Sequence, residues 1–167
     1  MFLISFLCLL IQGRPIFYKQ ERVGIKQSIF TIYKLRTMKK GTPNIATHLL
    51  EESDISLFTS IGPLIRKFSF DELPQLINIL KGDMVFIGPR PALYNQYDLI
   101  DLRTKVGVHS LTPGVTGWAQ VNGRDELNIT EKVKMDEYYF RNKSLWLNIK
   151  ILLMTLLKVL KTEGVAH

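Results

Sequence analysis

The chain has 167 residues, the length of one domain, which is long enough to bury a hydrophobic core. A hydrophobic share of 46% and an aromatic share of 10% exclude an intrinsically disordered tail. The net charge of +7 indicates an anionic partner, which nucleic acid, an acidic membrane surface and a phosphorylated substrate fit equally well. The single cysteine, Cys8, excludes an internal disulfide and a thiolate-rich metal site, and the spacing of the histidines does not suggest a metal site.

The N-terminal segment, residues 1–11, is apolar except for Ser5. As a helix it would be roughly 16 Å long, about half of a hydrocarbon core of ~30 Å. It has no basic region before it and no small-x-small cleavage site after it, so it does not resemble a signal peptide. A buried core helix and a helix that enters one leaflet of a membrane both fit this segment, and we favour membrane insertion for residues 1–12.

Short strands are expected in two places. Loose alternation over residues 16–20 and 28–34, with a turn around Gly24, predicts a small hairpin. A third strand is expected at residues 84–87, and it leads into the rigid sequence Gly88-Pro89-Arg90-Pro91.

Helices are expected to dominate the rest of the chain, at residues 61–67, 69–80, about 93–106 and 144–161. Gly82 is placed to end the second of them. Loops are expected at residues 41–44 and 113–118. The sequence therefore predicts one compact, helix-dominated α+β domain with short strands.

The C-terminal helix has the pattern of an interfacial helix. Lys150, Lys158 and Lys161 fall within about 80° of one another at ~100° per residue. Apolar side chains occupy much of the remaining arc, with Trp146 near the start. This pattern suits a helix that lies in the plane of a membrane interface, and it also fits a soluble amphipathic helix with a wide apolar face.

The segment of residues 66–75 (RKFSFDELPQ) carries the strongest chemical signal, the adjacent carboxylates Asp71 and Glu72. Ser69 followed three residues later by Glu72 is a capping box, and Asp71 is an alternative N-cap that would place Pro74 inside the first turn. In that purely structural interpretation each acid stabilises a helix N-terminus by ~0.3–1 kcal/mol.

The basic residues nearby favour a catalytic interpretation. Arg66 and Lys67 precede the acids by about one turn, and Arg90 follows downstream. A carboxylate at a helix N-terminus beside guanidinium groups stays ionised and can attack phosphorus. Arginines and exposed N–H groups would hold the phosphates of a diphosphate, and Mg²⁺ would bridge the phosphates to Asp71 and Glu72.

Two Gly/Pro-rich segments would complete such a site. The turn at residues 88–91 presents Arg90, and the segment at residues 113–124 contains Gln120 and Arg124, which would close over a nucleotide base or sugar. By spacing alone each is also an ordinary turn.

Taken together, these motifs resemble the bacterial sugar transferase family, the small monotopic phosphoglycosyl transferases. The matching motifs are G-x-P-I-F at 13–17, Q-x-R-x-G at 20–24, F-x-IYKLRTM at 30–38, RKFSFDELPQL at 66–76, LKGDM at 80–84, GPRP at 88–91 and PGVTGWAQVNGR at 113–124. They follow the family's order over nearly the whole chain.

The resemblance implies an enzyme of the bacterial inner membrane, with a re-entrant helix at residues 1–12 and a catalytic domain at 13–167 that faces the cytoplasm. Asp71 would attack the sugar-linked phosphate of a UDP-sugar and release UMP, and the phosphosugar would pass to undecaprenyl phosphate. Glu72 would organise Mg²⁺ or protons. The substrate-binding residues implied by the matching motifs are Lys34, Arg36, Arg66, Arg90, Gln120 and Arg124.

Family members carry a helical half-span before the re-entrant break, whereas this chain begins inside the second half, so the anchor is expected to be incomplete. Two alternatives remain open. One is a family member that has lost activity through truncation. The other is a basic module that binds a membrane surface or nucleic acid. Nucleic acid is not an expected partner, because the arginines gather around Gly/Pro turns and an acidic pair rather than alternating with aromatic residues.

Overall fold

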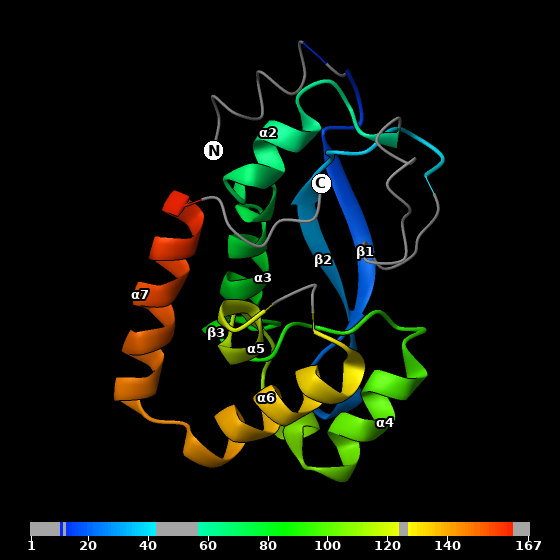
Figure 1. Ribbon diagram of the computed structural model, residues 1–167. Helices are drawn as coiled ribbons and strands as arrows, with labels where there is room; N and C mark the ends of the chain where they lie inside the picture. Colours follow the sequence, from blue (N-terminus) through cyan, green and yellow to red (C-terminus); the bar gives the residue numbers. More distant parts are fainter. Residues whose placement is uncertain (1–10, 12, 43–56, 124–126, 162–167) are drawn as a thin grey trace.

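The computed structural model describes residues 11, 13–42, 57–123 and 127–161 (Figure 1). The expected membrane-inserted segment at 1–12 lies outside the described residues except for Ile11, and Arg124 also lies outside them. Among the helices that are described, none is both long and apolar enough to cross a membrane.

The predicted hairpin is confirmed. Strands β1 (Phe17–Val23) and β2 (Ile29–Leu35) pair antiparallel, from Phe17 opposite Leu35 to Val23 opposite Ile29. The turn between them contains the short 3₁₀ helix η1 (Ile25–Gln27). The hairpin is the blue pair of strands in Figure 1.

The segment that follows the hairpin differs from the prediction at one point. Helix α2 (Gly62–Lys67) lies where it was expected, but the helix predicted at 69–80 is divided into the 3₁₀ helix η4 (Phe70–Glu72) and helix α3 (Gln75–Lys81). The division falls at Pro74, which has no backbone N–H and lies at the N-cap of α3. Ser69, with a left-handed φ of 55°, separates η4 from α2. Gly82, with φ of 83°, ends α3 as predicted.

A second, parallel sheet joins distant parts of the chain. Strands β3 (Val85–Ile87) and β4 (Gly114–Thr116) pair with Val85 opposite Gly114 and Ile87 opposite Thr116. The sequence had indicated a loop at residues 113–118, so β4 was missed. A Cβ on Gly114 would lie 2.1 Å from the backbone nitrogen of Gly88, so the close approach of the two backbones requires glycine there.

Helix α4 (Tyr97–Lys105) begins four residues later than predicted. Leu93 instead forms a bridge with Arg22, and its N–H donates to Oε1 of Gln96 at 2.9 Å. The 3₁₀ helix η5 (Val108–Ser110) and the short helix α5 (Trp118–Val121) follow.

Helix α6 (Ile129–Asn142) was not predicted, although its start carries a clear signal. The Asn128 side chain accepts from the Glu131 N–H at 2.9 Å, and the Glu131 carboxylate accepts from the Asn128 N–H at 3.0 Å. These two bonds form a capping box. Helix α7 (Leu145–Lys161) is confirmed at the C-terminal end.

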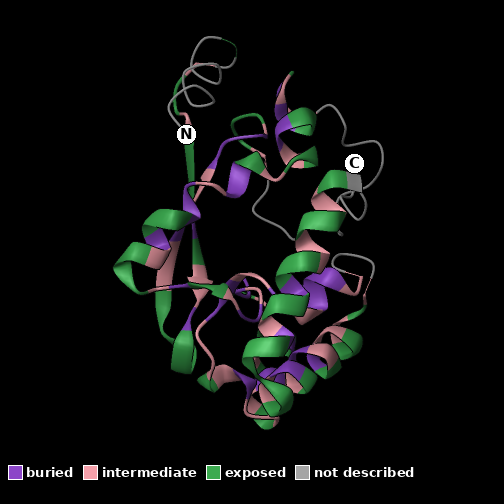
Figure 2. Ribbon diagram, turned by 90° about the vertical axis from the view of Figure 1, so that its left-hand side faces the viewer, coloured by how far each residue is buried: buried purple, intermediate pink, exposed green. Residues whose placement is uncertain are grey.

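Three clusters of buried hydrophobic residues hold the helix-dominated α+β fold together. Figure 2 colours all buried residues purple. The clusters are Val121, Tyr139, Leu147 and Ile151; Leu35 and Ile65; and Ala92, Leu99 and Val133. The first joins α5, α6 and α7, the second joins β2 to α2, and the third joins α4 to α6. In Figure 1, α3 lies between the hairpin and α7.

Candidate active site

The two acids lie on η4, which packs against strand β2. Asp71 and Glu72 are each only 9% exposed. The neighbouring helix α3 is fixed to β2 by Asn78, whose Nδ2 donates to the Thr31 carbonyl at 2.7 Å and whose Oδ1 accepts from the Tyr33 N–H at 3.1 Å. These bonds set the hairpin beside the acidic pair.

Neither N-cap predicted for this segment forms. The Ser69 N–H donates to the Arg66 carbonyl at 2.9 Å, and its side chain makes no capping bond. Helix α3 begins later, with Pro74 at its N-cap position. The carboxylate of Glu72 binds tertiary partners instead of the Ser69 N–H, so the predicted capping box is wrong.

Glu72 joins three separate parts of the chain. Its Oε1 accepts from Nζ of Lys34 at 3.1 Å and from Nη1 of Arg90 at 3.1 Å. Strand β2, helix η4 and the turn after β3 therefore meet at one carboxylate oxygen. The structure places Lys34 and Arg90, two of the predicted substrate-binding residues, beside the acidic pair, and their role in substrate binding stays a prediction.

Burial raises the pKa of Asp71 above its usual value. Lys34, Arg66 and Arg90 lower the pKa, and the neighbouring charge of Glu72 raises it, but the cost of burial outweighs the attraction of the cations. The sequence had predicted that a helix N-terminus and arginines would hold this carboxylate ionised. A raised pKa makes the ionised carboxylate more basic, which favours nucleophilic attack but lowers the fraction that is ionised.

Arg66 is the third predicted cation near the acids. Its charge lowers the pKa of Asp71, and its guanidinium group lies over the ring of Phe58 at 5.1 Å from the ring centroid. Stacking of this kind fixes the direction of a guanidinium group while keeping its charge. Three cations therefore act on Asp71 from β2, α2 and the turn after β3.

Arg22 belongs to the same group of charges, although the sequence did not single it out. Its Nε and Nη2 donate to Oε1 of Gln20 at 3.0 and 2.6 Å, and its Nη1 donates to the Pro91 carbonyl at 3.0 Å. Burial, followed by the charge of Arg90, lowers the pKa of Arg22 to about 10. The Q-x-R-x-G motif at residues 20–24 was the available signal.

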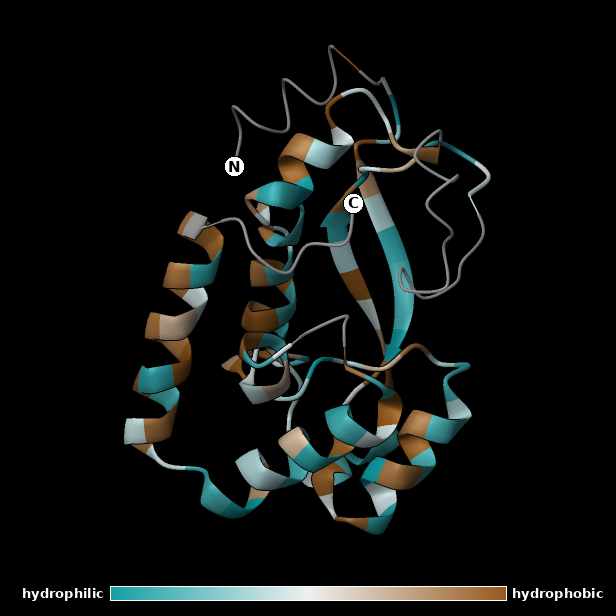
Figure 3. Cartoon of the chain, viewed as in Figure 1, coloured by the Kyte–Doolittle hydropathy of each residue, from teal (hydrophilic) through white to brown (hydrophobic). Residues whose placement is uncertain are grey.

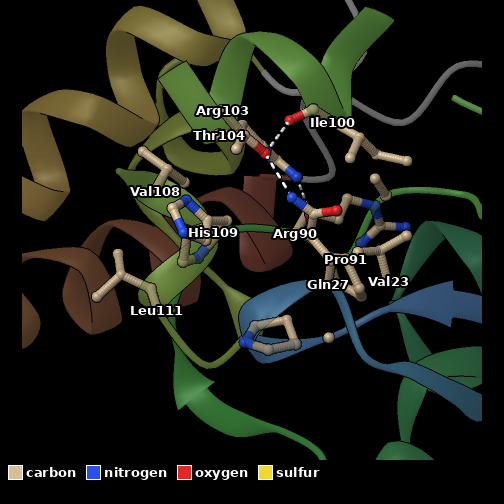
Figure 4. A pocket seen from close by; sticks show the side chains of 14 residues that line it. Val23, Gln27, Arg90, Pro91, Ile100, Arg103, Thr104, Val108, His109 and Leu111 are labelled. Carbon is tan, nitrogen blue, oxygen red and sulfur yellow. Dashed lines mark hydrogen bonds between the residues drawn. The ribbon is translucent and has the colours of Figure 1, made fainter. Parts of the chain in front are cut away.

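Arg103 holds the turn that carries Arg90. Its Nη1 donates to the Arg90 carbonyl at 2.8 Å, and its Nε and Nη2 donate to Oδ2 of Asp136 at 2.9 and 2.5 Å. Figure 4 shows Arg103 beside Arg90, at a small pocket of about 40 Å³ behind the turn. The sequence did not identify Arg103 or Asp136, because no local pattern links α4 to α6.

A larger cleft of about 270 Å³ opens beside the acidic pair, between α3 and α7. Its charged lining residues are Lys67, Glu72, Arg90 and Lys158. Asp71 is not one of its lining residues. The cleft therefore reaches the acidic pair on the side of Glu72 and Arg90.

Gln120 lines this cleft and is 9% exposed. Within the described part of the chain, neither its Nε2 nor its Oε1 has a hydrogen-bond partner, and both atoms are occluded from solvent. Its carboxamide would reach a ligand only after the side chain turns. The predicted role of Gln120 in substrate binding stays a prediction.

Arg36, another predicted substrate-binding residue, is buried just after the end of β2. Its Nη2 donates to the Gly13 carbonyl at 3.1 Å, which ties the end of β2 to the segment before β1. Arg36 is not among the charges that shift the pKa of Asp71. The structure brings together Lys34, Arg66 and Arg90 but gives Arg36 a different contact, and the predicted Arg124 lies outside the described residues.

The described residues contain no group of three His, Cys, Asp or Glu side chains that would hold a metal ion by themselves. The adjacent carboxylates of Asp71 and Glu72 still suit Mg²⁺. This ion commonly binds one or two carboxylates and completes its coordination with phosphate oxygens and water. The site has the charges to bind a diphosphate and a carboxylate that can attack phosphorus.

Comparisons with a family model and with individual proteins agree on one family. Residues 1–162 match the model described as bacterial sugar transferase. The chain is 44% identical to the uncharacterized sugar transferase EpsL of Bacillus subtilis, over 92% of the chain and 74% of that protein.

Two longer relatives have names that state an activity. The chain is 36% identical to the undecaprenyl-phosphate galactose phosphotransferase of Salmonella typhimurium, over 91% of the chain and 35% of that protein. It is also 36% identical to the UDP-glucose:undecaprenyl-phosphate glucose-1-phosphate transferase of Xanthomonas campestris pv. campestris, over 87% of the chain and 32% of that protein. The chain thus spans about a third of the length of these two relatives.

Proposed function

The chain belongs to the bacterial sugar transferase family, and we propose that it transfers a sugar 1-phosphate from a UDP-sugar to undecaprenyl phosphate and releases UMP. The names of its relatives support this donor and acceptor. The main support for the proposal is that Lys34 and Arg90 both bind the carboxylate of Glu72, next to the buried carboxylate of Asp71. Such a cluster suits chemistry on a diphosphate.

The reaction proceeds in two displacements at phosphorus. A carboxylate oxygen of Asp71 attacks the phosphorus that carries the sugar, a new P–O bond forms, and the bond to the bridging oxygen breaks so that UMP leaves with the electron pair. An oxygen of the acceptor phosphate then attacks the same phosphorus and displaces the Asp71 carboxylate. The products are UMP and a sugar diphosphate on the lipid.

The surrounding cations stabilise charge in both steps. Arg66 and Arg90 hold phosphate oxygens, and Lys34 balances the two carboxylates. Asp71 and Glu72 would hold Mg²⁺, which, when bound, neutralises part of the diphosphate charge. The contacts of Glu72 with Lys34 and Arg90 orient the cluster before substrate binds.

The enzyme would act at the inner membrane with its active site facing the cytoplasm, in the synthesis of exopolysaccharide or a related glycoconjugate. A polyprenyl acceptor requires contact with a bilayer. Helix α7 supports this proposal, because its leucines are exposed along most of its length. The brown segments of α7 in Figure 3 mark its hydrophobic residues.

The test uses the purified chain in detergent micelles with Mg²⁺, undecaprenyl phosphate and a panel of UDP-sugars. We expect UMP release with one or more donors and a lipid-linked product of matching mass. The Asp71→Asn variant should lose both UMP release and any trapped phosphosugar adduct. The change Glu137→Gln, at the partly exposed ion pair with Arg141 on α6, serves as a control and should keep full activity. Absence of UMP with every donor would favour an inactive scaffold.

A further inference from the structure

We propose that the cleft between α3 and α7 binds the acceptor lipid, with its phosphate at the cations and the first part of its prenyl chain on the apolar wall. The inference rests on the proposed transfer to a polyprenyl phosphate, and it assigns one of the two substrates to a defined surface. The assignment follows from three properties of the cleft: its apolar wall, its cations and its shortage of available polar groups.

Most of the wall is apolar, with Leu73, Leu76, Phe86, Val115, Val121 and Val159 as lining residues. The apolar surface also continues outside the cleft. Leu76 is 42% exposed, and Leu80, one turn further along the same face of α3, is 88% exposed. A hydrocarbon chain that leaves the cleft therefore finds further apolar surface and does not have to enter water.

The cations lie where a phosphate could meet them. Lys67 on α2 and Lys158 on α7 line the cleft from opposite elements, and Arg90 lines it beside Glu72. Among the described residues, neither Lys67 nor Lys158 forms an ion pair with a carboxylate. An anionic headgroup would supply the missing negative charge.

A nucleotide sugar fits this cleft poorly. A base, a ribose and a sugar present many hydrogen-bonding groups, and burying them without partners is costly. The hydroxyl groups of Thr116 and Thr155 bond each other at 2.8 Å, and the amide atoms of Gln120 are occluded, which leaves Ser69 as the remaining uncharged polar side chain of the lining. The cleft volume of about 270 Å³ accommodates a headgroup and a short part of a chain.

The position of the cleft gives the acceptor access to the reacting carboxylates. Glu72 and Arg90 line it, whereas Asp71 does not. The acceptor phosphate would therefore approach the acidic pair from the side of Glu72 and Arg90. The α7 wall would lie toward the membrane from which the lipid comes.

The experiment measures KM for each substrate separately, in detergent micelles, for Lys158→Ala and Leu76→Ser. We expect KM for undecaprenyl phosphate to rise about fivefold to tenfold in each variant, with KM for the UDP-sugar unchanged. Lys150→Ala is the matched control, because Lys150 lies on the same helix, contacts Trp118 and does not line the cleft. It removes the same charge and should leave both KM values unchanged.

A second measurement compares undecaprenyl phosphate with geranyl phosphate. The wild-type protein should prefer the longer chain, and Leu76→Ser should weaken that preference. A rise in KM for the UDP-sugar alone would assign the cleft to the donor and overturn the proposal. Unchanged KM values for both substrates in both variants would also overturn it. A wild-type protein that releases no UMP would instead refute the proposed function.

Discussion

Arg103 donates a hydrogen bond of 2.8 Å to the main-chain carbonyl of Arg90, while its other donors bind the buried carboxylate of Asp136. The contact links α4 and α6 to the turn whose side chain reaches Glu72. Arg103 is therefore a positioning residue: it fixes the backbone from which Arg90 extends and does not itself touch Glu72 in the described contacts.

From this buried ion pair we predict that a double substitution restores folding stability without restoring activity. Arg103→Met or Asp136→Leu alone should cost about 3–5 kcal/mol, because each leaves a buried charge unpaired. The double variant should recover most of the stability, since two apolar side chains can pack there, but its kcat/KM should stay low because the Arg90 carbonyl loses its donor. Urea denaturation and UMP release measure the two effects. Full recovery of kcat/KM in the double variant would contradict the positioning role.

The raised pKa of Asp71 predicts that this residue limits stability at neutral pH. A carboxyl group whose pKa is higher in the folded protein favours folding when protonated, and that contribution is lost as pH rises through the raised pKa. Asp71→Asn should therefore raise Tm at pH 7 while abolishing activity. The difference in Tm from wild type should shrink as pH falls toward the ordinary range of Asp. Thermal melts across pH measure it, and a lower Tm for the variant at pH 7 would contradict it.

A side chain at position 117 is predicted to clash with residues beside the cleft. Its backbone is extended, so any residue could adopt it, but a Cβ would lie 2.1 Å from the Gly88 carbonyl oxygen and 2.7 Å from Oε1 of Gln120. Gly117→Ala should destabilise the fold by about 1–3 kcal/mol and reduce activity. Gly82→Ala is a useful comparison, because it strains a residue with φ of 83° but has open space around it. Gly82→Ala should lower the free energy of unfolding by about 1–2 kcal/mol, and the protein that remains folded should keep its activity.

The exposed leucines of α7 predict attachment to a membrane surface. Leu153→Glu together with Leu157→Glu should reduce cosedimentation with anionic vesicles by severalfold, because both side chains are exposed and would bring charge into the interface. Tyr97→Glu, an exposed change on α4, is the control. Equal binding of the double variant and the wild type would indicate that α7 is not the attachment surface.

The two carboxylates also predict a requirement for a divalent cation. EDTA should stop UMP release, and added Mg²⁺ should restore it, because Asp71 and Glu72 together need phosphate oxygens to complete a metal site. Activity that persists in EDTA would mean that the cations of the chain alone neutralise the diphosphate. Folding should not change, and circular dichroism in EDTA provides that control.

The capping-box spacing occurs twice in this chain, and the capping box forms at only one of the two places. Asn128 and Glu131 form the capping box that their spacing allows, and α6 begins there. Ser69 and Glu72 have equivalent spacing, but Lys34 and Arg90 bind the Glu72 carboxylate and Ser69 turns left-handed. A capping preference of about 1 kcal/mol is readily outweighed by two charged tertiary contacts.

The sequence by itself determined the hairpin, the α7 helix, the end of α3 at Gly82 and the residue types of the acidic site, because these depend on periodicity and turn chemistry over a few neighbouring residues. Its ordered motifs also determined the family. Only the tertiary structure decided that Lys34 and Arg90 share one oxygen of Glu72, that Arg22 and Arg103 hold the turn between them, and that Arg36 binds the Gly13 carbonyl. Such contacts join residues far apart in the chain, where short-range patterns carry no information about which side chains will meet.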